Sequence, residues 1–130
     1  MATFTTTIDS ERELTAHTVT GTATAQELAG AINSYYAGPV TKLILWDFTD
    51  AQLNLITASQ IKDLVDLTKR YAALRVGGKT AFVASSDLGF GLGRMFDIQQ
   101  EANAAPVSHQ SFRTKAKALE WLLRPVDSRL

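Results

Sequence analysis

The N-terminal part of the chain alternates between apolar and polar residues in the way that half-exposed strands do. Phe4, Thr6 and Ile8 lie on one side of the run TFTTTI (3–8), and a second such run, ELTAHTVTG (13–21), follows the polar turn DSER. Alternation rich in threonine favours strands with one exposed face. The two runs are close enough in sequence to pair antiparallel.

Helical periodicity begins after the second strand. The run TAQE (24–27) has the pattern of a capping box, in which the threonine hydroxyl accepts from a free amide and the glutamate reaches back. Apolar residues then recur at helical spacing, and Gly38-Pro39 ends the helix. A second box at 57–60 opens another helix, whose inner stripe consists of Ile61, Leu64, Val65 and Thr68.

Two runs that are apolar on both faces indicate central strands. KLILWDF (42–48) and GGKTAFVAS (77–85) have this pattern, which is typical of parallel strands covered by helices on both sides. A third helix follows, then a weaker strand at 107–112 and a last helix at 114–123 that Pro125 ends. This order predicts an α/β fold: a single domain over residues 1–130, with a five-stranded, mostly parallel mixed sheet and about four helices.

Composition excludes several classes of function. Thirteen basic and 13 acidic residues give a formal net charge of zero, so no electrostatic surface for nucleic acid or an anionic membrane is expected. The absence of cysteine excludes disulfides, thiolate metal sites and a cysteine nucleophile. The start of the chain lacks the features of a signal peptide, and no apolar run approaches the ~20 residues of a membrane span. We therefore expect a soluble, cytoplasmic protein without a transmembrane segment.

Three glycines at alternate positions, Gly89, Gly91 and Gly93, follow the second buried strand. Glycines between a strand and a helix often hold a phosphate. Here Arg94 stands three positions after Gly91, which breaks the dinucleotide fingerprint, and the Gly-Lys-Ser/Thr ending of a phosphate loop is missing. Because a glycine inside a helix costs about 1 kcal/mol relative to alanine, we expect the helix to begin near Gly91 and the glycines to form a packing turn.

No motif for nucleophilic or metal chemistry is visible in the sequence. Ser85 and Ser86 end a strand, but no Gly-x-Ser-x-Gly elbow surrounds them. His17 and His109 are isolated, and their spacing suggests neither a catalytic triad nor a metal site. We therefore predict no metal and no cofactor.

Asp47 is the polar position of most interest. It ends the first buried strand, and ligands of open α/β sheets bind at the carboxyl ends of the strands. Arg94 is expected to point to the same rim or to solvent, which makes an Asp47–Arg94 contact possible. Alternatively Asp47 caps a turn, because DFTDA is rich in turn formers. Most aromatic residues are expected in the core, and some of them in the lining of an apolar pocket: Tyr35, Tyr36, Trp46, Phe48, Phe90 and Phe96.

Three stretches resemble the bacterial SpoIIAA-like family, whose fold is that of STAS domains. They are LILWDFTDA (43–51), KTAFVASSDLGFGLGRMF (79–96) and SHQSFRTKAKALEWLL (108–123). The resemblance covers nearly the whole chain and implies a small α/β domain without enzymatic activity. With the rim argument, it marks six candidate positions for binding a ligand or partner: Trp46, Asp47, Phe90, Gly91, Arg94 and Met95.

The resemblance implies two kinds of function. Anti-sigma-factor antagonists of this fold bind a kinase, which phosphorylates a serine at the start of the helix after the central strand. That region here reads Ile56-Thr57-Ala58-Ser59 and lacks the Asp-Ser-Ser-Gly pattern, so Thr57 and Ser59 are candidate phosphosites that helix capping also explains. The first hypothesis is therefore a non-catalytic regulatory or protein-interaction module. A relationship suggested between SpoIIAA-like proteins and CRAL-TRIO domains implies the alternative, a carrier of a small hydrophobic or lipid-like ligand at a membrane surface.

The sequence also suggests a catalytic alternative and an oligomeric state. An enzyme that uses Asp47 and Arg94 on the sheet rim is a third, less favoured hypothesis. We also expect at least a homodimer, because the strand from Phe4 to Ile8 looks like the edge of a sheet. Exposed edges are usually covered or paired.

Overall fold

A computed structural model describes residues 2–103 and 105–125 of the chain. It contains strands β1 (Thr3–Asp9), β2 (Leu14–Thr22), β3 (Leu43–Gln52), β4 (Lys79–Val83) and β5 (Ser108–Phe112). The α-helices are α1 (Ala25–Ala37), α2 (Ala58–Lys69), α3 (Asp87–Ala102) and α4 (Lys115–Leu123), and a short 3₁₀ helix, η1, spans Ala72–Arg75. None of the helices in these ranges is both long and apolar enough to cross a membrane.

The five strands form one sheet in the order β1-β2-β3-β4-β5. β1 is antiparallel to β2, and the other neighbouring strands pair in parallel. The α/β class, the mixed and mostly parallel sheet and the four helices are as predicted. β3 is the central strand, which explains why it is apolar on both faces. β1 lies at an edge, as expected, and the dimer that this edge suggests stays a prediction.

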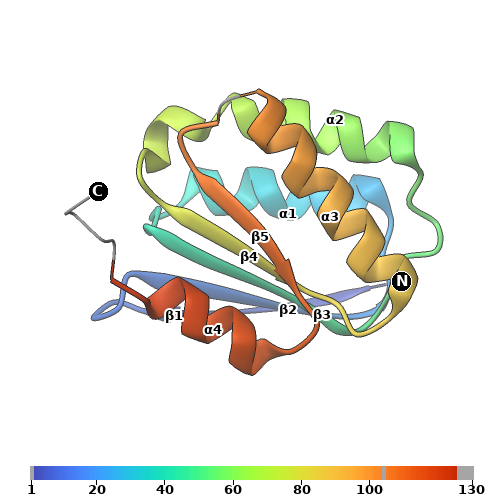
Figure 1. The fold of residues 1–130 in the computed structure, drawn as a ribbon, viewed down its shortest axis with the longest axis horizontal. Helices are drawn as coiled ribbons and strands as arrows, with labels where there is room; N and C mark the ends of the chain where they lie inside the picture. The colour runs from blue at the N-terminus through green and yellow to red at the C-terminus, as the bar shows by residue number, and fades with distance from the viewer. Residues whose placement is uncertain (1, 104, 126–130) are drawn as a thin grey trace.

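Helices cover the two faces of the sheet unequally. α1, α2 and α3 lie on one face, and α4 lies alone on the other (Figure 1). Alternate residues of β3 supply the two cores: Ile44 and Trp46 face the three helices, and Leu45 faces α4. The larger core therefore lies between the sheet and α1–α3.

Both predicted capping boxes are present. Thr24 accepts from the amide of Glu27 and Thr57 from that of Gln60, while the side chains of the third residues accept from the cap amides in return. Each box satisfies two amides that a helix start leaves without partners. The beginnings of α1 and α2 are thus fixed by four-residue sequences alone.

The predicted start of α3 near Gly91 is wrong. α3 begins at Asp87, and its N-cap is Ser86, whose hydroxyl accepts from the Gly89 amide. The serine cap and an acidic residue in the first turn outweigh the low helix propensity of the glycines that follow. The glycines lie in the first two turns of the helix and do not form a turn before it.

Close packing requires two of these glycines, but not Gly91. A Cβ added to Gly93 would lie 2.5 Å from the Ser111 hydroxyl oxygen, and one added to Gly89 would lie 3.0 Å from the Ala84 Cβ. A Cβ at Gly91 would have no neighbour within 4 Å. The expected packing role therefore belongs to the face of α3 that carries Gly89 and Gly93.

This difference gives a test of the fold. Gly91→Ala should stabilise the protein by up to about 1 kcal/mol, because alanine is the better helix former and the added methyl group meets open space. Gly93→Ala should destabilise it by about 1–3 kcal/mol, since the buried Ser111 would have to move. Denaturant unfolding of both variants measures the two effects. Equal effects of the same sign would contradict this packing of α3 on β5.

Candidate functional site

An apolar cavity of about 90 Å³ lies between the sheet and the three helices that cover its larger core. Its lining comes from α1, α2, η1 and α3 on one side and from β3, β4 and β5 on the other. The six aromatic residues named in the sequence analysis all contribute to this lining: Tyr35, Tyr36, Trp46, Phe48, Phe90 and Phe96. Two of the glycines of α3 also line it, and they fill no space with side chains. The pocket expected from the aromatic residues is therefore present.

Aromatic rings from the sheet and from α3 pack against one another along the cavity. Trp46 lies against the His17 ring, with centroids 4.1 Å apart, and stacks on Phe48 at 6.2 Å. Phe82 meets Phe96 edge to face at 5.0 Å. Such pairs are rigid and bury large apolar areas.

One end of the cavity is polar, and Arg75 is its centre. The side chain is only 2% exposed, and its five N–H groups all donate. The acceptors, at 2.8–3.3 Å, are three backbone carbonyls and two hydroxyls: Thr41 O, Lys42 O, Lys79 O, Tyr36 Oη and Thr80 Oγ1. No carboxylate forms an ion pair with Arg75 within the described ranges. A buried guanidinium is thus satisfied in its hydrogen bonds but not neutralised in its charge.

Arg75 is not among the candidate residues predicted from the sequence. The available signal is its place between Leu74 and Val76, directly before Gly77-Gly78 and a buried strand. A charged residue between two apolar ones in such a connection can be buried, but the carbonyls that accept from it lie as far as 34 residues away along the chain. Its role depends on tertiary contacts that the local sequence does not encode.

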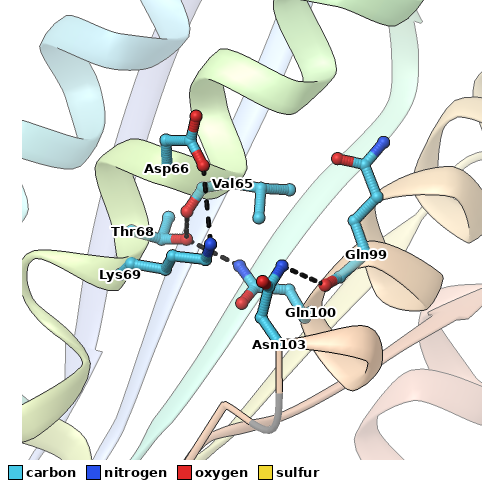
Figure 2. Close-up of polar contacts among 7 residues, drawn as sticks. All are labelled: Val65, Asp66, Thr68, Lys69, Gln99, Gln100 and Asn103. Atoms are coloured by element: carbon cyan, nitrogen blue, oxygen red, sulfur yellow. Dashed lines mark hydrogen bonds and ion pairs between the residues drawn. The ribbon is translucent and has the colours of Figure 1, made fainter.

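A side-chain hydrogen bond joins two helices over the cavity. Gln100 of α3 is buried, and its Nε2 donates to the hydroxyl of Thr68 in α2 at 2.6 Å, while that hydroxyl donates to the Val65 carbonyl at 2.8 Å (Figure 2). Both Gln100 and Thr68 line the cavity. Because helices run opposite to the strands in parallel α/β units, these residues lie near the amino ends of the strands, as Arg75 does. Most polar residues of the lining therefore gather toward one end, while Ser111 lies near the other.

Both histidines are neutral at neutral pH. Burial lowers the pKa of His17 to about 4. The pKa of His109 is also lowered to about 4, by burial first and by the nearby Arg75 charge second, although its contact with the Val107 carbonyl acts in the opposite direction. His109 lines the cavity, so the positive charge of Arg75 acts at this end of the site.

Asp97 is a second ionisable group that was not predicted from the sequence. It is 2% exposed, and neither carboxylate oxygen has a hydrogen-bond partner within the described part of the chain. Burial raises its pKa to about 6, although Ser111 and the Arg94 charge partly offset this effect. Asp97 lies one turn after Gly93 in α3 but does not line the cavity. Its position on the face that packs on β5 was the signal available in the sequence.

The structure does not bring the six predicted binding positions together. Trp46 and Phe90 line the cavity, and Met95 packs against the same core. Gly91 and Arg94 are exposed on α3, so Arg94 points to solvent as expected. The roles of these residues in binding stay predictions.

Asp47 neither ends its strand nor caps a turn, because β3 continues to Gln52 and its local partner Thr49 also lies within that strand. By strand alternation it lies on the opposite face of β3 from Trp46, and its Oδ1 accepts from the amide and the hydroxyl of Thr49. The predicted Asp47–Arg94 contact is not among the ion pairs of residues 2–103 and 105–125. Arg113 instead pairs with Asp87 at 2.8 Å.

Comparisons with known proteins show the fold. Neither the protein-family models nor the curated proteins give a match to this chain. Among solved structures, an anti-sigma factor antagonist from Mycobacterium paratuberculosis is similar, with a TM-score of 0.60, 16% identity and 94% of each chain covered. An uncharacterized protein of the DUF3478 family from Shewanella loihica PV-4, described as having a SpoIIAA-like fold, gives a TM-score of 0.57 and 16% identity over 93% of each chain. The chain therefore has the SpoIIAA-like fold that its sequence resembles.

Thr57 and Ser59 differ in a way that mutation can test. Thr57 caps α2, whereas Ser59 is exposed in the first turn of that helix. Thr57→Ala should lower the free energy of unfolding by about 0.5–2 kcal/mol, because the Gln60 amide loses its acceptor. Ser59→Ala, the control at the neighbouring site, should change it by less than about 0.5 kcal/mol. A larger loss at Ser59 than at Thr57 in denaturant titrations would contradict the capping assignment.

Asp97 makes stability depend on pH. Its pKa is raised from 3.8 to about 6 in the folded state, so its favourable contribution is complete below pH 3.8 and is lost as the pH rises through 6. Asp97→Asn removes the buried charge and should stabilise the protein by about 2–3 kcal/mol near pH 8, but little near pH 4. Unfolding midpoints of both proteins across this range measure the difference. A stabilisation that does not change with pH would contradict the raised pKa.

Proposed function

We propose that this protein is a non-catalytic binding domain with a SpoIIAA-like fold that holds a small apolar ligand between its sheet and helices α1–α3. The observation that carries the proposal is the cavity of about 90 Å³ in the larger core. Protein interiors are usually packed with few voids larger than a water molecule. A module that acts only through its surface has no need of such a space.

The chemistry of the lining supports a ligand that is mainly apolar. Aromatic and aliphatic side chains make up most of it, and a few polar groups gather toward one end. Binding sites for small molecules typically combine such walls with a small number of placed polar groups. The size of the space favours a short chain or a single ring.

The same lining supports a role without catalysis. None of the described residues that line the cavity is an aspartate or a glutamate. His109, the lining residue best suited to acid–base chemistry, has a pKa of about 4 and contacts a backbone carbonyl through Nδ1. The buried carboxylate of Asp97 lies outside the lining. A nucleophile, a base and an orienting acid therefore do not meet around this space.

A protein-interaction module is the second candidate, and a different surface favours it. Leu55 is 54% exposed in the segment after β3, and Leu88 is 52% exposed in the first turn of α3, after β4. Because β3 and β4 are parallel neighbours, both leucines lie at the carboxyl rim of the sheet, beside the start of α2 with Thr57 and Ser59. Exposed apolar groups at one rim are suited to a protein partner.

Binding of octanol tests the cavity. Native mass spectrometry of freshly purified protein should show a retained small molecule, and calorimetry after its removal should show saturable binding of octanol. Ala72→Leu adds three carbon atoms to the lining and should weaken octanol binding about tenfold or more. Ala73→Leu, at the exposed neighbouring position in η1, is the matched control and should bind octanol as the wild type does.

Two results would contradict the proposal. One is the absence of any retained molecule together with no saturable binding of octanol, octanoate or octylamine. The other is equal octanol affinity in Ala72→Leu and Ala73→Leu, which would place the binding elsewhere. Either result would leave the rim around Leu55 and Leu88 as the better-supported site of function.

A further inference from the structure

Arg75 carries a positive charge into a part of the protein where the described residues provide no negative one. It is buried, it lines the cavity, and its five hydrogen bonds all go to neutral acceptors. An unneutralised charge in a low-dielectric interior is costly, and an opposite charge nearby offsets much of that cost. The polar end of the cavity is therefore suited to an anion.

The hydroxyl groups beside Arg75 indicate where an anion would bind. Nη1 of Arg75 donates to Thr80 Oγ1 at 2.8 Å and to Tyr36 Oη at 3.3 Å. Each hydroxyl accepts from the guanidinium, so its own proton points away from Arg75, and neither proton has an acceptor within the described ranges. Both residues line the cavity. Two O–H donors polarised by a cation are thus available to a ligand.

We infer that the ligand is an amphiphile with a carboxylate head, which accepts hydrogen bonds from Tyr36 and Thr80 in front of Arg75. This inference rests on the proposed function, because it names the ligand class of the same cavity. A carboxylate has two acceptor oxygens, one for each hydroxyl proton, and its charge opposes that of the guanidinium. The apolar tail lies along the aromatic wall that contains Trp46 and Phe96.

Other head groups fit this end less well. A primary alcohol brings no charge and has one oxygen to accept from two donors. An ammonium group has no acceptor and is repelled by Arg75, whose charge also helps to lower the pKa of the neighbouring His109. Octanoate, octanol and octylamine share one tail and differ only in the head. Comparing their affinities therefore separates the contribution of the head group from that of the tail.

Calorimetry with these three compounds tests the inference. Octanoate should bind wild-type protein at least tenfold more tightly than octanol, and octylamine should bind more weakly than either. Tyr36→Phe and Thr80→Val each remove one hydroxyl while they keep the size of the side chain, and each should weaken octanoate binding about tenfold. Their octanol affinity should change by much less, because the tail contacts remain.

Tyr71→Phe is the matched control. The Tyr71 ring stacks on Tyr36 at 4.4 Å, but its hydroxyl donates to Asn33 at 2.6 Å and does not line the cavity. Tyr71→Phe should leave the preference for octanoate over octanol unchanged. This control separates the loss of a donor to the ligand from a general effect of removing a hydroxyl in this cluster of tyrosines.

The results of these experiments test the carboxylate head group and binding in the cavity separately. Equal affinity for octanoate and octanol, with both weakened by Ala72→Leu, would overturn the carboxylate and leave the proposed function intact. A preference for octanoate that survives in both Tyr36→Phe and Thr80→Val would also overturn it. Failure of all three compounds to bind, together with no retained molecule in native mass spectrometry, would contradict the proposed function itself.

Discussion

The guanidinium of Arg75 ties together three segments that are distant in the sequence. Its hydrogen bonds reach the backbone before β3, the backbone at the start of β4, and the end of α1 through Tyr36. Parallel strands are joined only through long crossovers, so their amino ends have no tight turn to hold them in register. One planar group with five fixed donors serves that purpose here. The same bonds place a buried charge at one end of the cavity, so the fold and the candidate site depend on a shared interaction.

Features of the fold were predictable from the sequence where they depend on residues close together in the chain. The capping boxes that begin with Thr24 and Thr57, the apolar faces of β3 and the edge position of β1 follow from residues within one short segment, and they were predicted. The start of α3 was missed because a serine cap competed with the low helix propensity of Gly89 and Gly91, and the cap prevailed. Local rules are reliable only where they do not conflict.

The site was predicted less well for a related reason. The aromatic lining follows from apolar positions on predicted elements, so a pocket could be expected. Arg75 and Asp97 are charged residues in ordinary-looking sequence, and only contacts with distant segments bury them. Asp47 was chosen because it was expected to end a strand, but β3 continues to Gln52, and the alternation along β3 turns Asp47 to the other face of the sheet. Burial of polar groups is a tertiary property, and binding sites depend on it.

Space in a core that excludes water also affects how a protein responds to pressure. The part of the space between the sheet and α1–α3 from which water is excluded disappears when the chain unfolds, so the unfolded protein and its solvent occupy a smaller total volume than the folded protein and its solvent. Hydrostatic pressure therefore favours unfolding of this domain more than of a fully packed domain of the same length. A molecule that fills the void removes that difference in volume, and the occupied protein should withstand pressures at which the empty protein unfolds.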